Sequence, residues 1–239
     1  MNDDQSLKEF LIDIGKSAIA MFLIGLYFSI DKIAIIGLNI FKINYQNWSE
    51  GLVYSLLLGL NILMILIISI IYYKRINKNF IEFKEKHDDY LKKYIKYWFY
   101  GLMLMVFSNL ILVSITGDIA GNENAVRELF STSPLYIYIS AVIIAPLLEE
   151  LIFRFCIRDI FPHSNILFIL ASGLIFGGCH VYGNVTNWVD MLYIIPYSSL
   201  GFAFAYIYTK TDNIFSTIGA HFIHNGIMMA LQILMFLFM

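Results

Sequence analysis

The sequence contains few charged residues. Only 14% of its 239 residues are Asp, Glu, Lys or Arg, whereas 59% are apolar, and the mean hydropathy is +0.71. A soluble domain carries about 25% charged residues, so this chain lacks the polar side chains that would cover a globule in water. The scarcity of charge therefore argues against an ordinary soluble protein and predicts an integral membrane protein.

Cysteine is also scarce, and no basic stripe is present. Cys156 and Cys179 both lie in or beside apolar runs, where a free thiol behaves as a small buried hydrophobe. The two cysteines exclude a disulfide framework and a zinc finger. The 16 Lys and Arg against 18 Asp and Glu give a net charge of −2, and the bases do not form the face that nucleic acid requires. We expect no nucleic-acid partner.

Long apolar runs, by contrast, are abundant. A helix that crosses a bilayer needs about 20 apolar residues, and seven runs approach or exceed that length. The sequence therefore predicts an all-α fold, a transmembrane helical bundle of about seven spans that forms a single membrane-embedded domain over residues 1–239. The expected spans are Ala18–Phe41, Gly51–Tyr73, Tyr97–Gly117, Pro134–Ile160, Ile166–Tyr182, Met191–Thr209 and Ile214–Met239.

The charged residues between the runs predict the orientation. Residues 74–96 contain eight of the 16 bases, and loops rich in Lys and Arg remain in the cytoplasm. A basic cytoplasmic loop at 74–96 places the N-terminus in the cytoplasm and the C-terminus outside. Asp31 and Lys32 interrupt the first run, which is either a span with an internal ion pair or a shorter span followed by an interfacial turn. Residues 118–133 are expected to form a mobile outer loop.

The fourth run carries three ionisable residues, Glu149, Glu150 and Arg154. Each costs about 2.5–3.5 kcal/mol at the centre of a membrane helix, so they must face water, one another or polar groups on neighbouring helices. Glu150 and Arg154 are four residues apart and share a helix face, which favours an ion pair. Glu149 lies about 100° around the helix, which leaves its carboxylate free. Pro146 is expected to loosen the turn before them.

Two later runs contain polar residues at a similar depth. His180 follows a run of small residues in the fifth span, and His221 and Asn225 lie four residues apart on one face of the seventh. Counting about 1.5 Å per residue from the expected turns places Glu150, His180 and His221 roughly 12–22 Å deep. We therefore expect these groups to converge near the middle of the membrane.

Such a set of groups suits hydrolysis. A carboxylate can take a proton from water as general base, while His or Asn side chains stabilise an oxyanion and protonate the leaving amine. This interpretation requires no cofactor. Glu149, His180 and His221 could instead ligate a catalytic zinc or another divalent metal ion, although the sequence lacks a His-Glu-x-x-His motif.

Three motifs on successive helices carry a family resemblance. Glu149-Glu150-Leu-Ile-Phe-Arg154 matches EExxxR, Phe176-Gly-Gly-Cys-His180 matches FxxxH, and His221-Phe-Ile-His-Asn225 matches HxxxN. In this order they resemble the CPBP family of intramembrane proteases, the CAAX protease and bacteriocin-processing family, also called Abi. The resemblance covers residues 149–225.

The resemblance implies roles for individual residues. Glu149 is similar to the water-activating glutamate of the family, and Glu150 and Arg154 form its supporting pair. The residues that position the water and stabilise the oxyanion would be His180, His221 and Asn225, with Phe176 and Gly177 toward the substrate and residues 134–239 as the catalytic helical core.

The family resemblance also implies a location and partners. It indicates a multi-pass protein of the cell membrane, the plasma membrane in a bacterium, with the lipid bilayer as its surroundings. The substrate would be a membrane-associated peptide or protein, and the role would be maturation of a peptide signal or bacteriocin, or immunity. A membrane sensor protein is a further possible partner.

Two functions of other classes stay open. Intramembrane carboxylates and histidines also mark proton-coupled transporters, although the sequence shows no inverted repeat. A non-catalytic membrane scaffold or immunity protein could use the same residues to hold a partner. A purely structural alternative for Glu149, Glu150 and Arg154 is a buried ion network that fixes helix packing, and we expect His224 to be structural.

Overall fold

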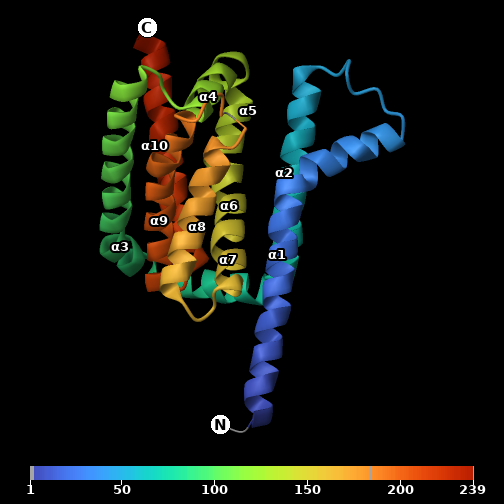
Figure 1. The fold of residues 1–239 in the computed structure, drawn as a ribbon, viewed down its shortest axis with the longest axis vertical. Helices are drawn as coiled ribbons and strands as arrows, with labels where there is room; N and C mark the ends of the chain where they lie inside the picture. The colour runs from blue at the N-terminus through green and yellow to red at the C-terminus, as the bar shows by residue number, and fades with distance from the viewer. Residues whose placement is uncertain (1–2, 184, 239) are drawn as a thin grey trace.

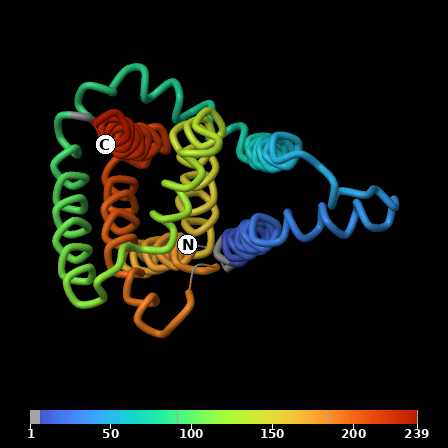
Figure 2. Tube along the Cα trace, turned by 90° about the horizontal axis from the view of Figure 1, so that it is seen from above, coloured from blue at the N-terminus to red at the C-terminus, as the bar shows by residue number. Residues whose placement is uncertain are grey.

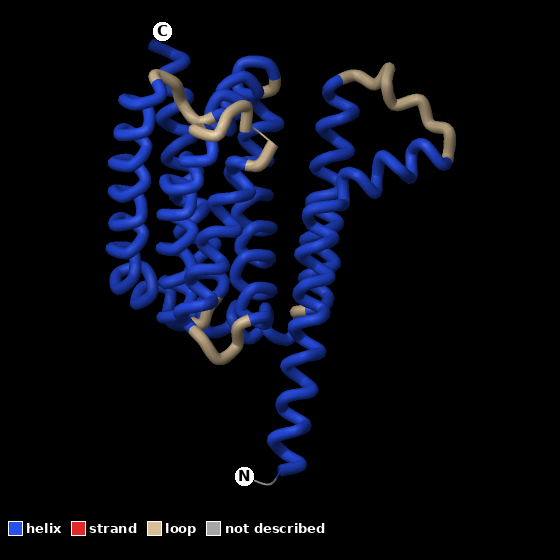
Figure 3. Tube along the Cα trace, viewed as in Figure 1, coloured by secondary structure: helices blue, strands red, loops and turns tan. Residues whose placement is uncertain are grey.

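The chain folds as a set of helices joined by short loops (Figure 1, Figure 3). The computed structural model describes residues 3–183 and 185–238, and no strand occurs among them, which confirms the expected all-α fold. The elements are α1 (Asp3–Ile40), α2 (Glu50–Ile71), α3 (Tyr73–Thr116), α4 (Gly121–Thr132), α5 (Pro134–Tyr138), η1 (Ile139–Ile144), α6 (Ala145–Glu150), η2 (Leu151–Cys156), α7 (Ile157–Ile160), α8 (Asn165–Val181), η3 (Asp190–Tyr193), α9 (Ile194–Thr211) and α10 (Ile214–Phe238).

The helices confirm a multi-pass membrane protein. Six helical stretches of the described chain are long and apolar enough to cross a bilayer, and they coincide with six of the expected spans. The fifth expected span is α8, whose 17 residues extend about 25 Å at 1.5 Å per residue. The two ends of the chain lie at opposite ends of the molecule (Figure 1), as an odd number of crossings requires.

The first span is a single helix that bends. α1 continues without a break from Asp3 to Ile40, and its C-terminal part turns away from the first part (Figure 1). Asp31 and Lys32 are both exposed on its surface. Viewed from above, α1 and α2 stand together at one side of the bundle that the later helices form (Figure 2).

Residues 74–96, expected as a basic cytoplasmic loop between two spans, are helical and form the first part of α3. This part crosses the base of the molecule from α2 to the bundle (Figure 1). The physical reason is that its charges have helical spacing, as in the Lys78 and Glu82 pair at i and i+4 (3.8 Å). Hydropathy separates polar from apolar segments but does not distinguish a polar helix from a loop.

Asn79 ties this basal helix to the bundle. Its Oδ1 accepts a hydrogen bond from the backbone N–H of Ile214 (2.9 Å), and its carbonyl oxygen accepts one from Asn213 Nδ2 (2.7 Å). Asn79 is only 3% exposed. The side chain therefore supplies an acceptor to a free N–H at the start of α10, where the helix itself offers none.

The outer segment at 118–133 is largely helical, contrary to the expected mobile loop. Within it, α4 has an ion pair between Glu123 and Arg127 at i and i+4, and a helix face that packs on a small apolar cluster. That face consists of Val126, Leu129 and Phe130, and the cluster contains Ile137, Val142 and Met229. The apolar contacts explain why a segment with several turn-forming residues still folds.

Candidate active site

The helix that carries the glutamates contains two π-helical turns, η1 and η2, on either side of α6. At the end of η1 the N–H of Ala145 donates to Ser140 O, an i to i+5 bond. The next such bond, from residue 146 to Ala141 O, cannot form because Pro146 has no N–H. Asn225 on α10 supplies the missing donor, since its Nδ2 donates to Ala141 O at 2.7 Å.

This geometry predicts a coupling between Asn225 and Pro146. We expect Asn225→Ala to lower the stability by about 1–3 kcal/mol, because Ala141 O loses its partner. In a Pro146→Ala background the backbone regains an N–H, so the same substitution should cost less. Thermal unfolding of the four variants in detergent measures this coupling. Asn122→Ala is the control, since the side-chain hydrogen bond of Asn122 to Tyr197 is long, at 3.4 Å. Equal costs of Asn225→Ala in both backgrounds would contradict the interpretation.

Glu150 and Arg154 form the predicted ion pair. Arg154 Nε donates to Glu150 Oε2 at 2.7 Å, and Nη2 donates to Oε1 at 3.2 Å. Both side chains are completely buried. Arg154 Nη1 also donates to the hydroxyl of Ser172 on α8, which in turn donates to Phe153 O at 2.7 Å. The guanidinium is thus held by two helices, and the Glu150 carboxylate is engaged through both oxygens.

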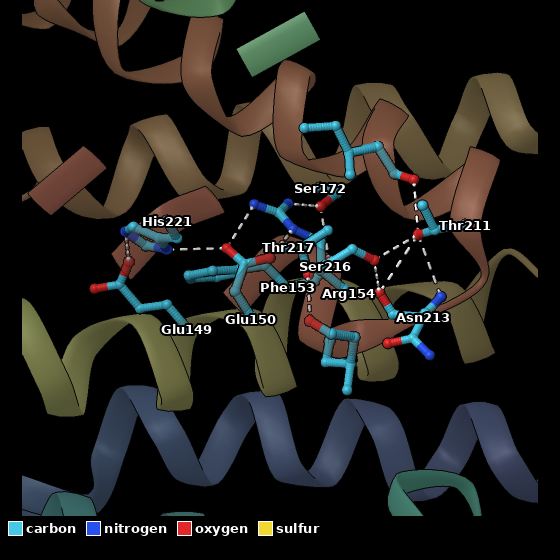
Figure 4. A network of polar contacts seen from close by, with 12 residues as sticks. Glu149, Glu150, Phe153, Arg154, Ser172, Thr211, Asn213, Ser216, Thr217 and His221 are labelled. Atoms are coloured by element: carbon cyan, nitrogen blue, oxygen red, sulfur yellow. Dashed lines mark hydrogen bonds and ion pairs between the residues drawn. The ribbon is translucent and has the colours of Figure 1, made fainter. Parts of the chain in front are cut away.

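His221 is oriented by Glu150. Its Nδ1 donates to Glu150 Oε1 at 3.0 Å, and its ring stacks on Phe204 with centroids 4.9 Å apart. The residue is 2% exposed. With Nδ1 occupied in this way, Nε2 faces Glu149, whose Oε2 lies 3.9 Å away (Figure 4).

Glu149 differs from Glu150 in its surroundings. Its Oε2 is buried and has no hydrogen-bond partner among the described residues. The distance of 3.9 Å to His221 Nε2 exceeds that of a hydrogen bond. Buried carboxylates are normally satisfied by partners or by water. Of two adjacent glutamates, Glu149 therefore keeps unused hydrogen-bonding capacity, whereas Glu150 is engaged by Arg154 and His221.

His180 lies next to this network without joining it. Its Nδ1 donates to Phe176 O at 2.9 Å, and its ring stacks on Tyr197 at a centroid distance of 4.9 Å. In the described chain no hydrogen bond or ion pair links His180 to Glu149 or His221. The buried Phe176 ring contacts both imidazoles, with centroids 4.7 Å from His180 and 5.6 Å from His221. Phe176 therefore packs between the two histidines of the motifs.

Gly177, expected near the substrate, lies instead in the contact between α8 and α9. A Cβ at Gly177 would overlap Ser198 and come within 2.9 Å of Ile194 O. One turn earlier on α8, Gly173 faces Gly201 of α9 in the same way. Small residues at this spacing let membrane helices approach closely. The glycine is therefore needed for the close packing of α8 against α9, which positions the helix that carries Phe176 and His180.

The structure adds residues that the sequence reasoning missed. Ser172 accepts from Arg154, Phe204 supports His221, and Tyr197 supports His180. Ser172 lies four residues before Phe176 and eight before His180, on the same face of an apolar helix, so its spacing was a usable signal. Phe204 and Tyr197 gave none, because aromatic residues are common in every span.

The residues named for a zinc site do not gather into one. Among the described residues, no group of three or more His, Cys, Asp or Glu side chains is arranged to hold a metal ion. His180 is separated from Glu149 and His221 by the contacts described above. The side chains near Glu149 therefore do not provide a preformed three-ligand site, such as zinc requires.

Fold and site together define a class of protein. It is a multi-pass helical membrane protein with a buried network of two carboxylates, an imidazole and a guanidinium inside its spans (Figure 4). Ionisable groups within membrane spans are energetically costly, and they usually mark functional sites.

Comparisons with known proteins agree with this class. Residues 131–227 match the family model for "Type II CAAX prenyl endopeptidase Rce1-like", a stretch that includes all the site residues. "Putative membrane peptidase YdiL" of Bacillus subtilis (strain 168) is 30% identical over 141 residues, which cover 56% of this chain and 54% of the relative. The chain thus aligns with about half the length of this relative. No solved structure matches the chain. These matches confirm the resemblance to the CAAX protease family.

Proposed function

We propose that the protein is an intramembrane endopeptidase that hydrolyses a peptide bond in a membrane-associated peptide or protein. One observation carries the proposal: Glu149 Oε2 is buried, without a hydrogen-bond partner in the described chain, and 3.9 Å from His221 Nε2. A carboxylate and an imidazole nitrogen at this separation can both bind one water molecule.

In the proposed mechanism Glu149 acts as general base. It takes a proton from the water, whose oxygen attacks the carbonyl carbon of the scissile bond. The proton then passes to the leaving amine as the carbon–nitrogen bond breaks. His221 donates from Nδ1 to Glu150, so its Nε2 can accept a hydrogen bond from the second O–H of the attacking water and orient it. Glu150 and Arg154 act through His221, and Asn225 acts by holding the helix that carries the glutamates.

The location of the site supports a membrane-associated substrate. Glu149 and His221 lie within two helices long enough to cross the bilayer, Pro134–Ile160 and Ile214–Phe238. A peptide that reaches them must enter the membrane or be anchored to it. Maturation of a peptide signal or bacteriocin, immunity, and partnership with a membrane sensor protein are the biological roles we propose for such an activity.

Purified full-length protein and a panel of amphipathic peptides, with and without a prenyl group, test the proposal. Mass spectrometry should find new fragments cut at one internal bond. Intact peptides throughout, together with proton-driven solute uptake in proteoliposomes, would favour the transporter. A parallel reaction with a chelator tests metal dependence: loss of cleavage that zinc restores would overturn the metal-free mechanism but not the peptidase.

A further inference from the structure

A cavity outside the site described above is lined by residues around the junction of α2 and α3, which lies at the base of the molecule in Figure 1. Its volume is about 770 Å³, within the range of small-molecule and lipid pockets. It is bounded by α1, the junction of α2 and α3, and α7. Its charged lining residues are Lys16, Lys74, Arg75, Arg158 and Asp159.

Asp159, the acidic member of this lining, is already neutralised. Arg75 Nη1 donates to Asp159 Oδ1 at 2.9 Å, and the hydroxyl of Tyr72 donates to Oδ2 at 2.9 Å. Arg75 Nη2 also donates to the hydroxyl of Tyr208 at 2.5 Å. Arg75 and Asp159 therefore satisfy each other, and the remaining three bases give the cavity its charge.

Within the described part of the chain, these three bases have no strong anionic partner. Lys16 forms an ion pair with Asp13 at 3.7 Å, which is a weak interaction because the Lys16 side chain is exposed to water. Arg158 Nη1 is buried and has no hydrogen-bond partner among the described residues, although its guanidinium lies over the Phe168 ring. Because a guanidinium stays protonated, a buried N–H without an acceptor is costly. The cavity thus offers unused donors and positive charge to an anion.

The rest of the lining is apolar and marks the membrane boundary. Ile19 of α1 and Ile70 and Ile71 of α2 line the cavity beside the bases. Lys74 follows the apolar span Glu50–Ile71 after two residues. A cavity that joins bases to isoleucines at the end of a span suits a molecule with a phosphate at one end and hydrocarbon at the other.

We propose that this cavity binds the headgroup of an anionic phospholipid from the leaflet at this end. The phosphate would accept from Arg158 and Lys74, a type of contact that arginine forms well, and the acyl chains would lie along the isoleucines. Because the lining comes from α1, α2, α3 and α7, the lipid would fasten the α1–α2 pair to the bundle.

Delipidated full-length protein in a neutral detergent tests the proposal. Native mass spectrometry should show retention of phosphatidylglycerol over phosphatidylcholine, and phosphatidylglycerol should raise the unfolding temperature. Arg158→Gln combined with Lys74→Gln should weaken phosphatidylglycerol binding at least about tenfold. Lys210→Gln is the matched control, because Lys210 is an exposed base of the same chain outside this lining, and it should leave binding unchanged.

Several results would overturn the proposal. Equal retention of the two lipids would show that charge does not select the ligand, and unchanged binding by the double variant would place the lipid elsewhere. If inorganic phosphate alone stabilises the protein as much as the lipid does, the ligand of the cavity is a soluble anion and not a lipid. Arg158→Lys keeps the positive charge, so it distinguishes loss of charge from misfolding. It should bind more phosphatidylglycerol than the double variant does. An equal loss of binding in both variants would overturn the proposed phosphate contact.

Discussion

Replacing Glu149 by Gln is expected to lower the rate of peptide cleavage by about 10²–10⁴-fold, the usual contribution of a general base. Gln has nearly the same size as Glu and can hydrogen-bond water, but it cannot take up a proton. Because Glu149 Oε2 has no hydrogen-bond partner in the described chain, the substitution breaks no such bond of that atom. Cleavage rates measured by mass spectrometry, with the unfolding temperature measured alongside, check this result.

A control for this substitution is available in the same chain. Glu50 lies at the exposed start of α2, outside the site, so Glu50→Gln makes the same chemical change without touching the network. It should keep the full cleavage rate. If Glu149→Gln also cleaves at the normal rate, Glu149 is not the base, and a scaffold role for the motif residues gains support.

Replacing Arg154 by Leu is expected to cost about 3–5 kcal/mol of stability, because it leaves the Glu150 carboxylate buried without its main counter-charge. Glu150 and Arg154 are both fully buried, so water cannot replace the lost guanidinium. The unfolding temperature in detergent should fall by about 10 °C for a chain of this length. Calorimetry or a thermal-shift assay measures the change.

The pair formed by Glu123 and Arg127 on α4 provides a matched comparison. It has the same residue types and the same i, i+4 spacing, but its side chains are 37% and 42% exposed. Arg127→Leu should therefore cost only about 0–1 kcal/mol. Glu150→Leu added to Arg154→Leu should recover part of the loss, since no unpaired charge then stays buried. An Arg154→Leu effect no larger than that of Arg127→Leu would refute the argument from burial.

The structure changes how the third motif is understood. Asn225 shares a helix face with His221, and the family resemblance implied that both side chains act on the water or the oxyanion. Instead, the Asn225 amide donates to Ala141 O, where Pro146 leaves the backbone without a donor. The motif residues Asn225 and Glu149 are thus connected through the helix that carries the glutamates.

The sequence by itself determined the class of protein and the local pairs. Composition and apolar run length predict a membrane bundle, because a chain so poor in charge cannot cover itself in water. The pair of Glu150 and Arg154 followed from helix geometry, which brings residues four apart together wherever the helix lies. The helical nature of residues 74–96 was missed because hydropathy reports on membrane depth and not on backbone conformation.

Only the tertiary structure decided which groups of other helices each polar side chain contacts. Arg154 of the same helix pairs with Glu150, but α10 places His221 between the two glutamates and α8 places Ser172 against the guanidinium. Gly177 likewise contacts α9 because of how the two helices cross. These contacts depend on how helices that are distant in the sequence are rotated and positioned relative to one another. The spacing of residues within one helix does not determine that rotation or position.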